Sequence, residues 1–206
     1  MEVVNHKEQV PFEHYCRMWR KLDPHAAAAR SGVPFDEAAG TFRVTLLGVA
    51  YRLSWPEFAI TAEGGEGFAL QSVPAQILLM RCVSGAAPAP FGGRFLTFRE
   101  TPWGDHYLKP FTGRCLNRAA FTFAPRLAAF RAAMSAMGGV PVPHGDAAFQ
   151  VEFLPGLYMQ IILWEGDDEF PPNSQILFSD NFPAVFAAED LVVCADILIG
   201  DGKCHM

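Results

Sequence analysis

The 206-residue chain lacks the short motifs that identify the commonest enzyme classes. It has no phosphate-binding loop, no Gly-x-Gly-x-x-Gly after a predicted strand, and no Gly-x-Ser-x-Gly nucleophile elbow. These absences exclude NTPases and Rossmann dehydrogenases and leave no convincing nucleophile. The sequence therefore specifies no catalytic mechanism.

The sequence is also poor in paired cysteines and in clustered positive charge. Its five cysteines stand far apart, with no Cys-x-x-Cys, which argues against a disulfide framework, a zinc ribbon or an iron–sulfur cluster. Lysine and arginine total 16 against 22 acidic residues, for a net charge of -6, and form no phosphate-binding stripe. We therefore expect neither an iron–sulfur cluster nor a nucleic-acid partner.

Long apolar runs are missing as well. No run approaches the roughly 20 apolar residues that span a bilayer, and residues 1–9 contain no apolar core typical of a signal peptide. We therefore expect a cytoplasmic protein with no membrane association. With 50% apolar and 18% charged residues, a globular fold is expected, and the length predicts a single domain over residues 1–206.

Two segments with turn signals between apolar strands predict β-hairpins. Residues 41–54 alternate between polar and apolar side chains around Gly48, and residues 148–164 flank the dipeptide Pro155-Gly156. We expect these hairpins to pair into one antiparallel sheet with helices packed on it. The predicted fold class is therefore α+β.

Helical periodicity and capping residues predict the remaining elements. The expected helices cover the region of residues 12–19, a short segment after Asp23-Pro24, and residues 74–83, 105–116, 125–137 and 188–199. Residues 93–100 alternate like a strand, and residues 174–178 are predicted to be a short helical piece.

An acidic segment follows the apolar strand Leu157 to Trp164 and contains Glu165, Asp167, Asp168 and Glu169. Carboxylates this close repel one another, so some of them must gain a proton, an arginine partner or a cation. Three interpretations stay open. The segment is a solvated turn paired with arginines, a divalent-cation site with Asp167, Asp168 and Glu169 as metal ligands, or the source of a general base with a raised pKa.

Two acid–histidine pairs are further candidates for chemistry. Asp105-His106 follows the charged dipeptide Arg99-Glu100 and a tight turn, and His144 with Asp146 lies in a loop before the second hairpin. A histidine here is a proton-transfer group or a metal ligand; alternatively Asp105 only caps a helix while His106 faces water. If both histidines converged on the acidic segment, a mixed nitrogen–oxygen metal site would result. The candidate residues are Arg99, Glu100, Asp105, His106, His144 and Asp146.

Three stretches carry a resemblance to a known family. They are residues 34–44, then Phe98-Arg99-Glu100 with Gly104 and Tyr107, and residues 163–171. Over about residues 12–195 the pattern resembles the family catalogued as domain of unknown function 3786, found largely in anaerobic bacteria and archaea. Some members carry a cysteine-rich iron–sulfur segment ahead of this domain and accompany corrinoid and one-carbon enzymes. Cys16 is the only cysteine in the first 81 residues here. The resemblance therefore implies a link to anaerobic metallo- or corrinoid-enzyme metabolism but attaches no activity.

Three functional hypotheses follow. The first is an accessory domain that binds a protein partner or a small ligand, with the acidic segment holding a cation or a basic patch. The second is a small metal-assisted hydrolase or lyase that uses residues 165–169 with His106 or His144. The third is a purely structural interaction module. An enzyme predicts a pocket with a histidine in reach of the carboxylates, whereas a binding module predicts an exposed apolar patch bordered by them.

Overall fold

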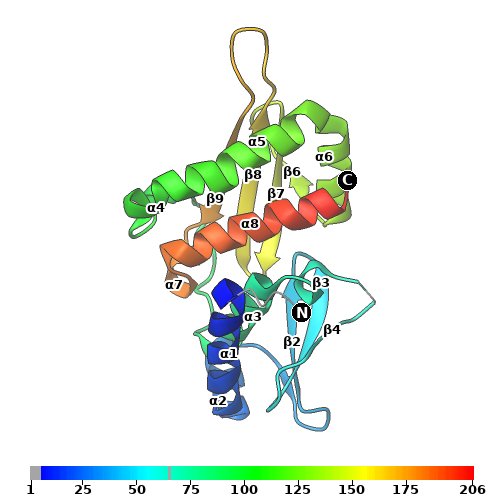
Figure 1. Ribbon diagram of the computed structural model, residues 1–206, viewed down its shortest axis with the longest axis vertical. Helices are drawn as coiled ribbons and strands as arrows, with labels where there is room; N and C mark the ends of the chain where they lie inside the picture. The colour runs from blue at the N-terminus through cyan, green and yellow to red at the C-terminus, as the bar shows by residue number, and fades with distance from the viewer. Residues whose placement is uncertain (1–5, 65) are drawn as a thin grey trace. The chain divides into compact units, whose positions relative to one another are not determined.

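The computed structural model describes residues 6–64 and 66–206 and divides into two compact units, residues 1–87 and 88–206 (Figure 1). Both units combine helices with antiparallel strands, so the α+β class is confirmed. The single domain over residues 1–206 stays a prediction. The expectation that residues 1–9 do not form a signal peptide concerns in part residues 1–5, which lie outside the described residues. No helix in the described ranges has the length and hydropathy to cross a membrane.

In its described residues, the first unit contains three α-helices and a four-stranded sheet in the order β1-β2-β3-β4. Its elements are α1 (His6–Arg20), α2 (Pro24–Ser31), β1 (Phe35–Asp36), β2 (Thr41–Leu46), β3 (Val49–Ser54), β4 (Ile60–Ala62) and α3 (Val73–Ser84). The predicted caps of α2 form, since the Asp23 side chain accepts a hydrogen bond from the Ala26 N–H and Gly32 ends the helix in the left-handed conformation.

The first predicted hairpin is β2–β3, paired from Thr41 opposite Ser54 to Leu46 opposite Val49. Its turn residues Leu47 and Gly48 both have positive φ, of 48° and 81°. Two such residues match the twist of antiparallel strands, which explains why this short connection can close the hairpin.

The second unit contains a five-stranded antiparallel sheet in the order β5-β9-β8-β7-β6. Its strands are β5 (Phe95–Thr97), β6 (Val140–Pro141), β7 (Ala147–Leu154), β8 (Leu157–Trp164) and β9 (Asn173–Ser179). Its helices are α4 (Gly104–Phe111), the π-helical turn η3 (Thr112–Asn117), α5 (Arg118–Phe123), α6 (Leu127–Ala136), α7 (Phe182–Val185) and α8 (Ala188–Cys204). In Figure 1 the α4–α5 segment and α8 run side by side across one face of this sheet.

Phenylalanine rings fill the space between the helices and this sheet. Phe98 stacks on Phe111 with ring centroids 4.0 Å apart, and Phe178 contacts both rings and Phe182. All four side chains are essentially inaccessible to solvent. Burial of several large rings explains much of the high phenylalanine content of the chain.

The two predicted hairpins form in different sheets rather than in one, which corrects the expected arrangement. The β2–β3 hairpin takes its edge partners β1 and β4 from the residues that flank it. The β7–β8 hairpin instead gains β9, the strand that follows it. The first hairpin therefore completes its sheet with its neighbours along the chain, whereas the second sheet also includes the distant strand β5, which pairs with β9.

The segment predicted to be helical at residues 174–178 is part of strand β9, so that prediction is wrong. Ser174, Ile176 and Phe178 are buried while Gln175 and Leu177 between them are partly exposed, which is the period of a strand. Short apolar runs fit a helix or a strand equally well by composition. Backbone pairing of residues 173–178 with β8 makes this segment a strand.

Candidate functional site

The acidic segment lies in the connection between β8 and β9, which extends beyond the ends of the strands (Figure 1). Every residue from Trp164 to Pro171 is exposed. Within the described part of the chain, none of the four carboxylates of residues 165–169 forms an ion pair. The expected pairing with arginine is therefore not found there, and the segment presents unpaired negative charge to solvent.

Asp167 fixes the conformation of this connection. Its Oδ1 accepts hydrogen bonds from the backbone N–H groups of Phe170, at 2.7 Å, and Glu169, at 2.9 Å. Its own N–H donates to the Phe170 carbonyl oxygen at 2.9 Å. The two N–H donors stabilise the charged form and lower the pKa of Asp167. Asp167 therefore does not have the raised pKa expected of a general base, and a general base among the other carboxylates stays a prediction.

Asp146 joins the predicted loop to the base of the same connection. Its Oδ2 accepts a hydrogen bond from the Glu165 N–H at 2.8 Å, and its own N–H donates to the Leu163 carbonyl oxygen at 2.9 Å. Arg131 of α6 donates to the Asp146 carbonyl oxygen. Asp146 therefore has a structural role at the point where β8 ends, while His144 beside it is exposed.

The predicted site residues Arg99, Glu100 and Asp105 lie just before α4 and in its first turn. Glu100 accepts hydrogen bonds from the Thr97 N–H and hydroxyl and from Arg94, and these donors lower the pKa of Glu100. Arg99 pairs with Asp105 at 3.1 Å. Asp105 lies in the first turn of α4 rather than at the N-cap, so the predicted capping role is wrong.

No metal centre is assembled from these candidates. In the described residues, no group of three or more histidine, cysteine, aspartate or glutamate side chains is arranged to hold a metal ion. The assignment of Asp167, Asp168 and Glu169 as metal ligands stays a prediction. The same holds for a convergence of His106 and His144 on the acidic segment.

An open cleft with aromatic walls lies beside the acidic segment. The Phe121, Trp164 and Phe170 side chains are 62%, 38% and 67% exposed, which is unusual for residues of this size. The cleft has a volume of about 630 Å³. It is lined by Asn117, Phe121, Trp164, Glu165, Phe170, Pro171, Pro172 and Asn173. We call these residues the aromatic cleft.

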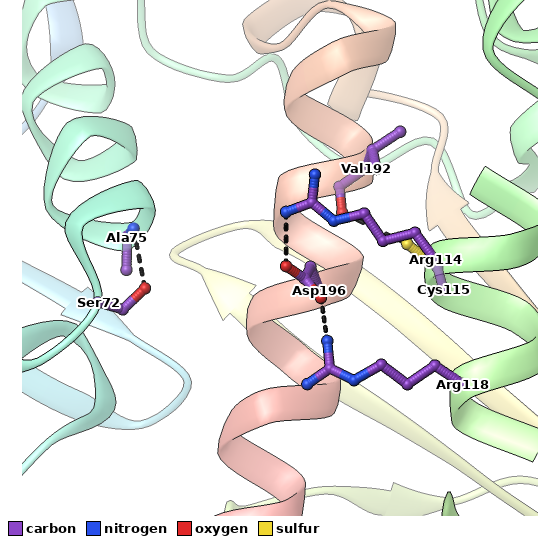
Figure 2. Close-up of polar contacts among 7 residues, drawn as sticks. All are labelled: Ser72, Ala75, Arg114, Cys115, Arg118, Val192 and Asp196. Carbon is purple, nitrogen blue, oxygen red and sulfur yellow. Dashed lines mark hydrogen bonds and ion pairs between the residues drawn. The ribbon is translucent and has the colours of Figure 1, made fainter. Parts of the chain in front are cut away.

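Polar contacts hold the π-helical wall of the aromatic cleft against α8 (Figure 2). Asp196 accepts hydrogen bonds from Arg114, at 2.7 Å, and from Arg118. The Cys115 thiol donates to the Val192 carbonyl oxygen at 3.5 Å, and burial, helped by the charge of Asp196, raises its pKa to about 12. Figure 2 also shows the separate cap of α3 in the first unit, where the Ser72 hydroxyl accepts from the Ala75 N–H.

A π-helical turn often marks a functional site, and here it carries Asn117 into the lining of the cleft. The Ser174 hydroxyl of β9 donates to the Leu116 carbonyl oxygen of the same π-helical turn at 2.7 Å and so connects the turn to the sheet. These contacts position the wall before any ligand binds.

Sequence reasoning identified the acidic side of this site and missed Asn117 and Phe121. Both lie in a helical region more than 40 residues before the acidic segment, and only the packing of η3 and α5 against the sheet brings them to it. The positions of Trp164 and Phe170 on either side of four carboxylates were the signal available in the sequence.

Comparison with known proteins identifies a family but no activity. Neither a curated protein nor a solved structure matches the chain. A family model described as "Domain of unknown function (DUF3786)" matches residues 23–201. Residues 23–201 include all of the sheet of the second unit and most of the first unit. The chain therefore belongs to the family described as domain of unknown function DUF3786.

Proposed function

We propose that the chain is a partner-binding module that holds a basic segment of another protein in the aromatic cleft. The observation that carries this proposal is the position of three exposed aromatic rings beside four carboxylates that form no ion pair in the described residues. This is the arrangement expected of a binding module rather than of a hydrolase.

The aromatic rings supply the binding energy in this proposal. Aromatic side chains dominate the energetics of protein interfaces, and their faces attract the guanidinium and ammonium groups of arginine and lysine. Pro171 and Pro172 line the cleft next to Phe170. Because proline fixes its own φ, this wall loses little conformational freedom when a partner binds.

The carboxylates supply selectivity for a cationic partner. Exposed ion pairs contribute only about 0–1 kcal/mol each, so the acidic segment adds little to affinity. Four like charges in five residues do create a local negative potential that attracts basic segments and raises the association rate. The Asp167 hydrogen bonds fix the backbone turn of residues 167–170, which carries three of these charges.

The alternative of a metal-assisted hydrolase gains no support from the geometry. Its candidate ligands form no metal cluster within the described residues, and the pKa of Asp167 is lowered rather than raised. The link to anaerobic metallo- or corrinoid enzymes rests on the family resemblance and stays a prediction. It is compatible with a module that binds such an enzyme.

Two synthetic peptides of equal length and charge test the proposal. One alternates arginine with leucine and the other alternates arginine with serine. Titrated into the ¹⁵N-labelled chain, the arginine–leucine peptide should shift the Trp164 indole and Phe170 amide signals saturably. The arginine–serine peptide should bind at least about tenfold more weakly, because its serine side chains bury little apolar surface against the aromatic walls.

Variants separate the two parts of the site. Trp164→Ala and Phe170→Ala should each weaken binding of the arginine–leucine peptide, while Val140→Ala, at an equally exposed apolar residue of the second unit, should not. Equal binding of the two peptides would show that the cleft gives no apolar contact to its partner and would overturn the proposal. Equal binding by the wild type and both aromatic variants would do the same.

Charge variants complete the test. Asp168→Asn together with Glu169→Gln should slow association and remove most of its dependence on salt concentration, because long-range attraction is lost. The matched control replaces two exposed acids of the first unit, Glu37→Gln together with Glu66→Gln, and should leave the association rate unchanged.

A further inference from the structure

A second exposed aromatic group lies at the start of α4, away from the residues of the aromatic cleft. Trp103 is 70% exposed and has a φ of 64°. A large side chain rarely adopts this left-handed conformation, and residues that do so are concentrated at functional sites. The chain therefore holds a tryptophan in a strained conformation at a position where the ring gains little burial.

The turn that holds Trp103 is rigid. The Thr101 hydroxyl donates to the Phe98 carbonyl oxygen at 2.6 Å, and the Gly104 N–H donates to the Thr101 carbonyl oxygen at 2.9 Å. A Cβ atom on Gly104 would overlap the Phe98 carbonyl group. Because Phe98, Thr101 and Gly104 are all buried, the core itself fixes the direction in which Trp103 leaves the turn.

Trp103 forms one side of a separate pocket of about 570 Å³. The other lining residues are His106, Tyr107, Ala187, Ala188 and Glu189. The His106 ring meets the Trp103 ring edge-on at 5.3 Å. Ala187 and Ala188 have side chains too small to fill the space between the rings and the first turn of α8.

The Glu189 carboxylate has a fixed position at this pocket. The Tyr107 hydroxyl donates to Glu189 Oε1 at 2.5 Å, and this hydrogen bond raises the pKa of Tyr107. One carboxylate oxygen is thereby occupied, and the negative charge remains on the lining. Aromatic faces together with a carboxylate are the groups that recognise organic cations.

An anionic ligand fits this pocket poorly, although it lies at the start of a helix. Asp190 already accepts a hydrogen bond from the Ala187 N–H at 3.0 Å. Glu189 and Asp190 also offset the positive end of the α8 dipole. The local charge therefore disfavours a phosphate or a carboxylate and favours a cation.

We propose that this pocket binds an alkylammonium group through the Trp103 face and the Glu189 carboxylate. The group is carried either by a small amine or by a lysine side chain, methylated or not. This site is distinct from the aromatic cleft, so either proposal can fail without the other.

Choline and its uncharged carbon isostere, 3,3-dimethylbutan-1-ol, test the proposal on the full chain. The two ligands have nearly the same shape, so a difference in affinity reports the positive charge. Choline should shift the Trp103 indole signal saturably and bind about 2-fold to 30-fold more tightly than the isostere, the range that a cation–π contact gives between exposed and desolvated sites. The Trp164 indole signal, followed in the same titration, should not move with it.

Two variants test the residues. Glu189→Gln keeps an acceptor for the Tyr107 hydroxyl and removes the charge, so it should weaken choline binding by several-fold. Trp103→Gly suits the positive φ and should leave the chain folded while the His106 and Tyr107 amide signals no longer respond to choline. Val140→Ala is the exposed control and should bind choline as the wild type does.

The source of the ammonium group is decided by adding N-acetyl-lysine amide and its trimethylated form. Tighter binding of choline than of both lysine derivatives supports a small amine, and tighter binding of either derivative supports a lysine side chain. Equal binding of choline and its isostere overturns the proposal, as does the absence of saturable binding by all three cations. Unchanged choline binding in Glu189→Gln and Trp103→Gly overturns it as well.

Discussion

Replacing Gly104 by alanine should damage the second unit more than the small size of the change suggests. The added Cβ would overlap the Phe98 carbonyl oxygen and lie 2.9 Å from the Phe98 carbonyl carbon and 3.0 Å from Thr101 Oγ1. The first two are backbone atoms, which cannot rotate away as the end of a flexible side chain can. The turn must open for the methyl group to fit.

The magnitude follows from what opening the turn disrupts. Forcing an extra methyl group into a packed region costs about 1–3 kcal/mol. The displaced Phe98 carbonyl also accepts the buried Thr101 hydroxyl, and loss of such a hydrogen bond costs about 1 kcal/mol more. We therefore expect Gly104→Ala to lower the free energy of unfolding by about 2–4 kcal/mol.

The matched control is Gly113→Ala in the π-helical turn of the same helical segment. Apart from the backbone of its own helix, no atom lies within 4 Å of a Cβ placed there, and alanine favours helix by up to about 1 kcal/mol over glycine. Urea unfolding followed by hydrogen exchange of the β8 amides measures both variants. A loss of less than about 0.5 kcal/mol for Gly104→Ala, or equal effects of the two substitutions, would refute this account of the turn.

Three further outcomes are expected. Burial raises the pKa of Asp201 in the folded chain above its usual 3.8, so the folded chain loses stability as the pH rises through this raised pKa. Asp201→Asn should therefore unfold at a higher urea concentration than the wild type at neutral pH. This difference in stability should disappear when the pH falls below about 4. Burial raises the pKa of Cys115 to about 12, so iodoacetamide at pH 8 should alkylate the exposed Cys204 and spare Cys115 until the chain unfolds, as mass spectrometry of the peptides would show. Asp196→Ala should cost about 1 kcal/mol in urea unfolding, because Arg118 and its neighbouring arginine lose their shared acceptor. An equal cost of Asp196→Ala when both arginines are already alanine would contradict this.

Patterns within short stretches predicted much of the local structure. The alternation around Gly48 gave the β2–β3 hairpin at residues 41–54, and Pro155-Gly156 gave β7–β8. The cap formed by Asp23 was also predicted from neighbouring residues. Each of these features depends on contacts among residues close together in the chain.

Features that depend on distant contacts were missed. Strand β9 exists because residues 173–178 pair with β8, and its composition did not distinguish strand from helix. The helix predicted to end near residue 116 continues through η3 and α5 to Phe123. That continuation places Phe121 at the acidic segment, which no local pattern could predict.

The turn before α4 shows the same limit. Asp105 next to a tight turn predicted a helix cap, but Trp103 occupies the N-cap in the left-handed conformation. The Gly104 position against the buried Phe98 carbonyl decides this geometry. The sequence shows a glycine at this position but does not show which backbone group lies against it.

The affinity of the arginine–leucine peptide for the wild type and for Trp164→Ala, measured by calorimetry, tests the central claim most directly. Truncating a ring that anchors a partner in a binding cleft costs about 2 kcal/mol or more. The proposed aromatic cleft therefore predicts that Trp164→Ala weakens binding by at least about tenfold, while Val140→Ala leaves it unchanged. Equal dissociation constants for the wild type and Trp164→Ala would contradict the claim that this cleft is where a basic partner binds.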